Sequence, residues 1–533
     1  MNKDVRIGFD VGGTFTDGVI VRGNDILSKA KTLTTEDVTT GIINAMDDLL
    51  EKSEVEAGKI GMVSFGTTHT TNAIIERQNL NKVGVFRIGA PATTAIPPLT
   101  GWPEDLKEAI GGEENTFIFE GGSEYDGRDI VPLEDESSIR EACEKVKGKV
   151  DSVAVTGVFS PMIPEHENRA AEIIKEVLGD DILITLSQNI STISLLEREN
   201  STILNASVIS VMQRSINALQ QAAKNRGVDA PLFVVQNDGS VMSADYAIDY
   251  PIFTVASGPA ASVRGAVHLS GVEDGVVADV GGTSTDVGYI VEGFPRESAI
   301  TVSIGGVKTN IRCPDLLSIA LGGGTIIKNR GTEVLGIGPE STGYNLVNLG
   351  RSFGGPMLTV HDIAVARDDI GENLDIFETN FVTHPDKIEQ ISEKLVTEST
   401  EKIKELLEVT IDQMKTTPEE IPAIIVGGGA TTMPEKDIAG TSKVINPDHF
   451  EVCGAVGATI AEISAHAEGV VDLEVEDRRE AIDKVVDSAK NNLVTAGGLL
   501  ETATIMDIEE IPFAYMPGKR QKIRVRVKGE IFK

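Results

Sequence analysis

The sequence predicts an α/β protein built from two related lobes, with a further α/β subdomain inserted into the first lobe. Three observations lead to this fold class. An eight-residue motif occurs twice, strand-like and helix-like segments alternate along the chain, and 533 residues at about 150 per domain allow two to four domains. Hydrophobic residues make up 41% and charged residues 24%, which is typical of globular proteins and argues against a disordered chain.

The repeated motif reads DVGGTFTD at 10–17 and DVGGTSTD at 279–286, so the two copies differ only at Phe15 and Ser284. Each copy follows a β-rich run and precedes another, which predicts a strand, a tight Gly-Gly turn and a second strand. About 270 residues separate the copies, far more than the period of a solenoid, so we expect two lobes that each carry one hairpin.

Other segments show helical or strand-like periodicity in turn. The expected helices span 37–51, 165–179, 194–226, 386–414 and 452–464, and the expected strands span 150–159, 231–236, 359–366, 423–426 and 519–528. Bases alternate with apolar residues over 519–528, which favours an edge strand protected by its charge. The Gly/Pro-rich stretch 89–103 is interpreted as a loop that opens the inserted subdomain.

These elements suggest five consecutive parts. We expect the first part of the N-terminal lobe over 1–80, an inserted α/β subdomain over 81–190, and the remainder of the N-terminal lobe over 191–270. A C-terminal nucleotide-binding lobe over 271–470 and a helix plus β tail over 471–533 follow.

The composition excludes several classes of function. The chain has 82 acidic and 48 basic residues and a net charge of −34, which repels nucleic acids and anionic membranes. Three distant cysteines form neither a disulfide framework nor a zinc site. The N-terminus enters a strand pattern without a signal-like stretch, and no apolar run is long enough to span a membrane. We therefore expect a soluble, cytoplasmic protein.

Each repeated turn has the composition of a phosphate-binding loop. Glycine lets backbone N–H groups approach phosphate oxygens, and a threonine hydroxyl adds a donor. An aspartate would repel phosphate directly but can bind Mg²⁺ through its water shell, so Asp10 and Asp279 are the expected metal and catalytic residues. The second aspartates, Asp17 and Asp286, could cap the turns or take part in the metal and proton chemistry. The expected phosphate contacts are Gly12, Gly13, Thr14, Thr16, Gly281, Gly282 and Thr283.

A third glycine cluster, GGGA at 427–430, follows an apolar strand. Gly427, Gly428 and Gly429 would admit a flat adenosine ring against the backbone. The structural alternative is that the two repeated motifs are tight turns in which aspartate satisfies local N–H groups, and that the GGG cluster is a structural loop.

These motifs resemble, in the same order, the phosphate 1, phosphate 2 and adenosine motifs of the sugar kinase, Hsp70 and actin superfamily. Further segments are similar to the ATP-binding A subunit of the hydantoinase/oxoprolinase family, and the similarity extends from Ile7 to about Ile463. They are FGTTHTTNAIIER (65–77), EGGSEYDGRDI (120–130), ERENSTILNA (197–206), QNDGSVMSADYA (236–247), FTVASGPAASVRGA (253–266) and the GGGT and GIGPESTG clusters at 322–325 and 336–343.

The resemblance implies two ribonuclease H-like lobes of the sugar kinase/Hsp70/actin type that close on ATP and Mg²⁺, and a second subunit. The chain resembles the short branch, because it has no room for the extra C-terminal domain of long members. Long members also carry a histidine before the GTT motif, where this chain has Phe65, whereas His69 comes four residues later. A role of that histidine in long members therefore does not transfer.

Phosphoryl transfer from ATP to an amide carbonyl oxygen would make an imidate phosphate that water can attack. We therefore expect an ATP-dependent hydrolase subunit that opens a cyclic amide or imide of the hydantoin, 5-oxoproline or lactam type, in an oligomer. The alternatives are a carboxylase subunit of the acetone carboxylase type, a nucleotide-driven switch or chaperone, and a small-molecule kinase.

The substrate side rests on fewer residues. His69 could polarise the carbonyl or relay a proton, or it could form a structural hydrogen bond at the start of a helix. The SGPAAS segment (257–262) could face an anion with helix N-terminal N–H groups, or simply begin a helix. Asp362 is a further candidate by the family resemblance, although adjacent residues on a strand, such as His361 and Asp362, face opposite ways and cannot share a metal.

Overall fold

The computed structural model describes residues 4–12, 15–33, 38–124, 127–133, 136–191, 194–298, 301–367, 382–434, 438–460, 462–513 and 518–531. The chain forms two compact units. Unit 1 comprises Met1–Gly66, Ser257–Ser298 and Pro314–Ile460, and unit 2 comprises Thr67–Ala256, Ala299–Cys313 and Ala461–Lys533. Both copies of the repeated motif belong to unit 1. The division into five consecutive parts stays a prediction.

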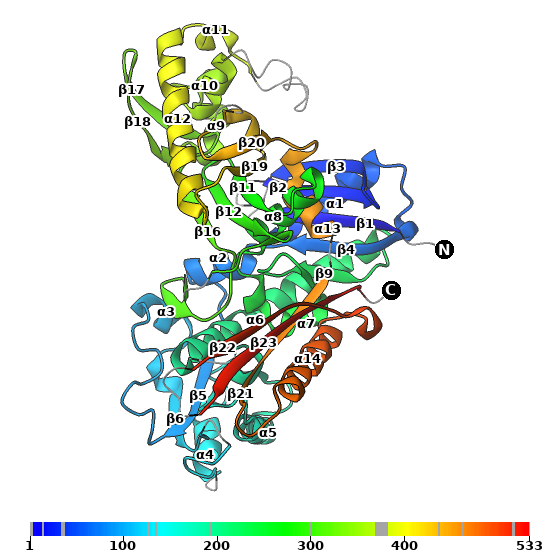
Figure 1. Cartoon of the computed structure of the whole chain (residues 1–533), viewed down its shortest axis with the longest axis vertical. Coiled ribbons are helices and arrows are strands. Elements are labelled where there is room, and N and C mark those ends of the chain that lie inside the picture. Colours follow the sequence, from blue (N-terminus) through cyan, green and yellow to red (C-terminus); the bar gives the residue numbers. More distant parts are fainter. Residues whose placement is uncertain are drawn as a thin grey trace. The chain divides into compact units, whose positions relative to one another are not determined.

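The first sheet region of unit 1 has the strand order β4-β1-β2-β3. β1 and β2 form an antiparallel hairpin, β3 pairs antiparallel with β2, and β4 pairs parallel with β1 on its other side. Helix α1 packs against β2 and β3 (Figure 1). The bounds are β1 Val5–Val11, β2 Phe15–Arg22, β3 Asp25–Leu33, α1 Val38–Lys52 and β4 Ile60–Gly66.

The second sheet of unit 1 repeats this topology. Its order is β13-β12-β11-β19-β20, and β16 also pairs with β12. β11 and β12 form an antiparallel hairpin, β16 pairs antiparallel with β12, and β19 pairs parallel with β11. The lobes predicted from the repeated motif are therefore related in topology. The bounds are β11 Gly275–Val280, β12 Thr285–Val291, β13 Phe294–Pro295, β16 Leu316–Ile319, β19 Ile421–Val426 and β20 Thr441–Ile445.

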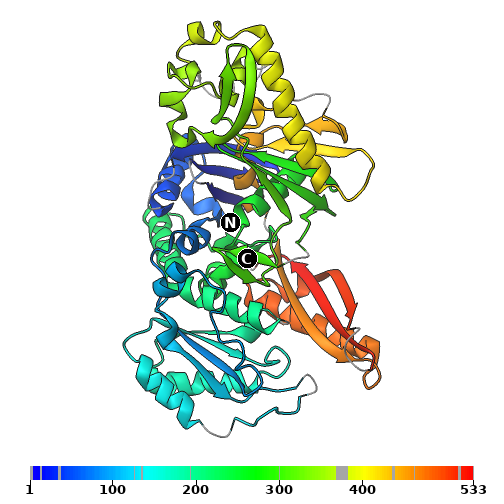
Figure 2. The ribbon, with the colours of Figure 1, turned by 90° about the vertical axis from the view of Figure 1, so that its left-hand side faces the viewer.

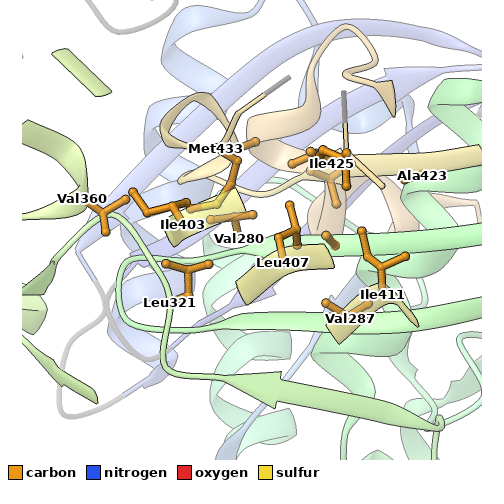
Figure 3. Packing of buried hydrophobic residues seen from close by; sticks show 14 of the residues in the cluster. Val280, Val287, Leu321, Val360, Ile403, Leu407, Ile411, Ala423, Ile425 and Met433 are labelled. Carbon is orange, nitrogen blue, oxygen red and sulfur yellow. The ribbon is translucent and has the colours of Figure 1, made fainter. Parts of the chain in front are cut away.

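Helix α12 packs against the second sheet and contributes to its hydrophobic core. Ile403, Leu407 and Ile411 recur at a spacing of four and lie on one helix face, where they pack with Val280 and Ile425 of the sheet (Figure 3). The β17–β18 hairpin lies alongside α12 in both views (Figure 1 and Figure 2). The remaining elements here are β17 Thr325–Arg330, β18 Glu333–Ser341, α9 Leu346–Leu349, α10 Val360–Ala366, α11 Pro385–Ile388 and α12 Glu393–Met414.

Two small-residue helices of unit 1, α8 (Ser257–Ser270) and α13 (Cys453–Thr459), pack closely together. A Cβ atom at Gly457 would lie 1.9 Å from the Ala261 carbonyl oxygen, and one at Gly265 would lie 2.0 Å from that of Cys453. Only glycine permits this approach. The helix predicted over 452–464 spans only Cys453–Thr459 in the structure, and strand β21 begins at Ile463.

Unit 2 contains a four-stranded parallel sheet with the order β6-β5-β7-β8. Helices α4 and α5 cover it, and their apolar residues pack with Phe86 and Val155 of the strands. The arrangement confirms the strand predicted over 150–159 and the helix predicted over 165–179. The bounds are β5 Val83–Ala90, α3 Glu104–Ala109, β6 Thr116–Glu120, α4 Ser137–Val146, β7 Ser152–Gly157, α5 Glu165–Leu178 and β8 Leu183–Leu186.

Unit 2 also contains a second sheet region with the order β22-β23-β21-β10-β9. The long helix predicted over 194–226 is α6. The bounds are α2 His69–Glu76, α6 Leu195–Asn225, β9 Leu232–Val235, β10 Val241–Ser243, α7 Ala244–Asp249, β14 Val302–Ile304, β15 Val307–Thr309, β21 Ile463–Asp472, α14 Arg478–Thr495, β22 Thr504–Pro512 and β23 Arg520–Gly529.

The prediction that the basic segment 519–528 is an edge strand is wrong. β23 pairs with β21 on one side and with β22 on the other, so it lies inside the sheet. Its basic side chains face acidic residues of both neighbours: Lys522 lies 3.2 Å from Glu468, and Arg524 lies 3.6 Å from Glu509. The alternation that suggested edge protection instead serves cross-strand ion pairing.

The prediction of a strand over 359–366 is also wrong, because these residues form helix α10 after the N-cap residue Thr359. The carboxylate of Asp362 is fully buried and accepts five hydrogen bonds, from backbone or hydroxyl groups of Arg351, Ser352 and Thr359, over 2.7–3.1 Å. The contacts form a capping box. Asp362 therefore holds the start of a helix.

Of the helices that the structure describes, none combines the length and the apolar character needed to cross a membrane.

Candidate functional site

Four aspartates occupy matching positions on the two hairpins of unit 1. Asp10 of β1 lies opposite Asp17 of β2, and Asp279 of β11 lies opposite Asp286 of β12. In each hairpin the first aspartate stands where the central strand ends and the turn begins. The hairpin form predicted for both copies of the repeated motif is confirmed.

The two turns also close in the same way. The Gly12 N–H donates to the Phe15 carbonyl oxygen at 3.0 Å, and the Gly281 N–H donates to that of Ser284 at 2.8 Å. Gly13 and Thr14, two of the predicted phosphate contacts, lie outside the described residues. Their counterparts in the second turn, Gly282 and Thr283, are exposed.

Backbone hydrogen bonds from the GGGT loop support the second turn, whereas Gly282 at its tip is exposed. The GGGT loop donates to it from Gly323 to the Gly281 carbonyl oxygen at 3.1 Å and from Gly324 to that of Gly282 at 2.7 Å. No described atom lies within 4 Å of a Cβ atom placed on Gly282. The turn therefore presents Gly282 and Thr283 on an accessible and well-supported edge.

Glycines from three elements surround the carboxylate of Asp10. A Cβ atom would lie 2.0 Å from Asp10 Oδ2 if it were placed on Gly454 of α13. It would lie 3.3 Å from Asp10 Oδ1 if placed on Gly66 of β4, and 3.6 Å from it if placed on Gly258 of α8. The SGPAAS segment therefore begins helix α8 next to this carboxylate. Gly454 leaves the room in which Asp10 sits.

The third glycine loop docks on the second hairpin. A Cβ atom at Gly427, whose φ is +91°, would lie 2.2 Å from Asp279 Oδ1, and the Gly429 N–H donates to the Val280 carbonyl oxygen at 2.8 Å. A hydrogen bond from Ser262 of α8 also reaches the Asp279 side chain. Gly427, Gly428 and Gly429 thus lie together with the second hairpin in unit 1.

The acidic groups perturb one another. Burial, with smaller contributions from the charges of Asp17 and Asp279, raises the pKa of Asp10 to about 8. Burial is also the largest cause that raises the pKa of Asp279 to about 6; the Ser262 hydrogen bond opposes this rise, and the charges of Asp286 and Asp17 contribute to it. Burial also raises the pKa of Asp286, whose carboxylate accepts a hydrogen bond from Ser318. Both hairpins thus contribute to one cluster of negative charge.

The donor set fits a magnesium ion. Carboxylate oxygens are the protein ligands that Mg²⁺ prefers, and a cation beside Asp10 and Asp279 would favour their charged forms, which burial disfavours. Within the described ranges, no group of three or more His, Cys, Asp or Glu residues has the arrangement of a complete metal shell.

Lys31 of β3 is a member of this cluster that the sequence analysis did not single out. Its Nζ atom lies 2.8 Å from Asp17 Oδ1 and opposes the rise in the pKa of Asp10, Asp17 and Asp279. No sequence pattern singled it out, because its pairing with Asp17 follows from the register between β2 and β3.

Two other predicted residues do not belong to the exposed turns of the hairpins. Thr16, predicted to bind phosphate, is fully buried within β2. His69, predicted to be catalytic, belongs to unit 2, where it is the first residue of α2. Its Nδ1 atom lies 3.1 Å from Ser215 Oγ of α6, and its backbone N–H donates to Thr67 Oγ1 at 3.1 Å. The roles of both residues stay predictions.

The raised pKa of Asp10 predicts a pH-dependent stability. Between about pH 4 and about pH 8, Asp10 keeps a proton in the folded protein that it has released in the unfolded chain. Protonated Asp10 therefore adds to the free energy of unfolding, fully below about pH 4, and this contribution is lost as the pH rises to about 8. Asp10→Asn cannot titrate. We expect the variant to gain about 1–3 kcal/mol over the wild type between pH 5 and pH 8.5 in chelator.

Urea unfolding of both proteins at several pH values measures this gain. Asp362→Asn is the control variant, since it removes a carboxylate that accepts five hydrogen bonds, and it should lower the free energy of unfolding across the tested pH range. A constant difference between Asp10→Asn and the wild type across the pH range would contradict the acidic cluster.

Comparison with known proteins connects this geometry to a family. Residues 6–178 match the model of the hydantoinase/oxoprolinase N-terminal region, and residues 198–511 match the hydantoinase/oxoprolinase model. The two matches together contain both hairpins and the third glycine loop.

Curated relatives with enzyme names include two that are named as subunits. The chain is 28% identical to the caprolactamase subunit alpha of Pseudomonas jessenii over 396 residues, and 26% identical to the acetophenone carboxylase gamma subunit of Aromatoleum aromaticum over 397 residues. Each alignment covers 68% of this chain, and 54% and 53% of the relatives respectively. The chain thus spans about half the length of the curated relatives that it matches.

One solved structure supports the fold. The crystal structure of ATP-dependent caprolactamase from Pseudomonas jessenii matches with a TM-score of 0.76 and 18% sequence identity, and the match covers 99% of this chain and 88% of that one. At this identity the likeness shows the fold alone. It confirms the predicted α/β fold class.

Proposed function

The chain belongs to the hydantoinase/oxoprolinase family, and from this premise we propose that it is an ATP-dependent subunit that activates the carbonyl group of a cyclic amide or imide for ring opening. The observation that carries the proposal is the pair of matching hairpins in unit 1, whose leading aspartates Asp10 and Asp279 both have pKa values raised by burial and by neighbouring aspartates. Two acidic turns with glycine edges suit a polyphosphate that arrives with a magnesium ion.

In this proposal the two turns hold the phosphate chain. The backbone N–H groups of Gly13 and Gly282 and the hydroxyls of Thr14 and Thr283 donate to phosphate oxygens. Gly12 and Gly281, whose N–H groups close the turns, border the phosphates, while the third glycine loop borders the adenosine. Asp10 and Asp279 would hold the water shell of Mg²⁺, which supplies charge neutralisation of the transferring phosphoryl group.

Phosphoryl transfer requires little covalent chemistry from the protein, which mainly positions the reactants and stabilises charge. The carbonyl oxygen attacks the γ-phosphorus and ADP leaves, which gives an imidate phosphate. A water molecule adds to its carbon, and the ring C–N bond breaks as the nitrogen leaves with a proton, which gives an acyl phosphate. A second water attacks the same carbon and releases inorganic phosphate that keeps the original carbonyl oxygen. The residues of this chain align and neutralise the reacting groups. Asp286, at the second hairpin, and His69 of unit 2 are the proposed proton-handling residues, and the relatives named as subunits favour a second polypeptide that completes the hydrolysis.

A carboxylase role is the second candidate, because one relative is the acetophenone carboxylase gamma subunit at 26% identity. The same ATP site could phosphorylate a ketone as its enol or bicarbonate as carboxyphosphate. The two candidates share their phosphate residues and differ only in the acceptor.

Isotope transfer separates these candidates. The chain, with and without its partner subunit, is supplied with ATP, Mg²⁺ and one substrate labelled with oxygen-18 at the carbonyl: hydantoin, 5-oxoproline, caprolactam, a ketone or bicarbonate. We expect ATP turnover to rise with a cyclic amide and the label to appear in inorganic phosphate. Label transfer only from a ketone or bicarbonate would establish the carboxylase instead. Turnover that responds to none of them, but to unfolded peptides, would refute both.

A further inference from the structure

The two hairpins of unit 1 differ at one structurally equivalent position. On the first, Asp17 of β2 pairs in register with Lys31 of β3. On the second, Asp286 of β12 pairs in register with Ser318 of β16. β3 and β16 are the same strand in the repeated topology, since each pairs antiparallel with the second strand of its hairpin. The first hairpin therefore carries a cation where the second carries a neutral hydroxyl.

The ammonium of Lys31 lies between two parts of the candidate site. Its Nζ atom is 2.8 Å from Asp17 Oδ1 and 5.0 Å from the centre of the Phe15 ring. The same atom is 3.2 Å from where a Cβ atom on Gly428 would lie. The glycine at 428 thus leaves the room that the lysine occupies, and Lys31 connects the first hairpin with the third loop.

This position suits recognition of phosphate. A lysine ammonium has three N–H donors, of which Asp17 takes one, and it binds phosphate as a compact point charge. The Phe15 ring and the carboxylate restrict where the ammonium can go, which lowers the entropy lost when it binds a ligand. Lys31 also acts electrostatically on three aspartates of both hairpins.

We propose that Lys31 is a positioning residue that binds the terminal phosphate groups of the nucleotide from the side of the first hairpin. The proposal rests on the proposed function, because it requires a nucleotide between the hairpins. It also assigns a direction in which that nucleotide binds. The neutral Ser318 gives the second hairpin no matching charge. The most negative end of the nucleotide therefore lies towards β2 and β3.

The chain offers a matched control on the same strand. Lys29 lies two residues before Lys31, on the same face of β3, and pairs with Glu451. The test compares Lys31→Met, Lys31→Arg and Lys29→Met by calorimetric titration with ATP and with AMP in the presence of Mg²⁺. AMP shares the adenosine and the first phosphate but lacks the terminal groups.

We expect Lys31→Met to weaken ATP binding by about 10- to 100-fold, as for loss of one charge-assisted contact, and to change AMP binding by less than about twofold. Lys31→Arg should recover most of the ATP affinity, and Lys29→Met should bind both nucleotides as the wild type does. If Lys31→Met fails to fold because Asp17 loses its partner, the double variant Asp17→Asn, Lys31→Met leaves no unpaired carboxylate and replaces it.

Three results would overturn the assignment: wild-type ATP affinity in Lys31→Met, parallel losses of ATP and AMP binding, or an equal loss in Lys29→Met. The failure of the proposed function looks different. In that case the wild-type chain itself binds no ATP, whereas a failure of the Lys31 assignment alone leaves wild-type ATP binding and amide-stimulated turnover intact.

Discussion

Replacing Asp10 or Asp279 with asparagine is expected to reduce Mg²⁺-dependent ATP turnover by at least about 100-fold, while the protein stays folded. Asparagine keeps the shape of each side chain but removes the charge that would attract the metal ion. The two aspartates are enclosed by glycine and serine contacts, so the isosteric change fits the same space. Turnover at saturating ATP and amide, together with a thermal unfolding curve for each variant, measures both effects.

Asp274→Asn is the matched control, since this exposed aspartate lies just before β11 on the same chain segment as Asp279. It should retain wild-type turnover. Raising the Mg²⁺ concentration should not rescue Asp10→Asn. Near-normal turnover in both Asp10→Asn and Asp279→Asn would remove the phosphate and metal assignment of the hairpins.

Breaking the buried ion pair of unit 2 is expected to cost about 3–5 kcal/mol of unfolding free energy. Arg87 of β5 is fully buried and Glu199 of α6 is 1% exposed, and the Arg87 Nε–H donates to Glu199 Oε1 at 2.7 Å. Arg87 also donates to the carbonyl oxygens of Thr93 and Ile96. Glu199→Ala leaves the guanidinium buried without its carboxylate, and urea unfolding of the variant measures the loss.

The double variant Arg87→Met, Glu199→Leu separates the loss of a partner from the value of the pair. Two apolar side chains of similar size should recover most of the stability, because no buried charge remains. α6 also carries Ser215, whose hydroxyl contacts His69, so each variant should be checked for a change in amide-stimulated turnover. A Glu199→Ala protein as stable as the wild type would show that water reaches this pair.

The local elements were predictable because their signals lie within a few consecutive residues. The two DVGGT motifs sit between β-rich runs, and the spacing of apolar residues predicted α1, α5 and α6 to within a few residues at each end. The segments 359–366 and 519–528 were misassigned because their patterns fit two structures. TVHDIAVA has the apolar content of a strand, but a capping box at Thr359 starts a helix. An alternating basic strand suits an edge, or an interior position between acidic neighbours.

The candidate site likewise combines features set by the local sequence with features set by tertiary contacts. The amino-acid sequence alone determined the strand–turn–strand form of both hairpins and, through its repeat, the relation between the lobes, since these depend on short-range backbone preferences. Only the tertiary structure decided that Gly454 and Gly427 enclose the two aspartates, that Lys31 faces Asp17, and that Asp362 holds a helix start. Such contacts join residues up to hundreds of positions apart. They arise from the packing of whole sheets and helices, which no local pattern encodes.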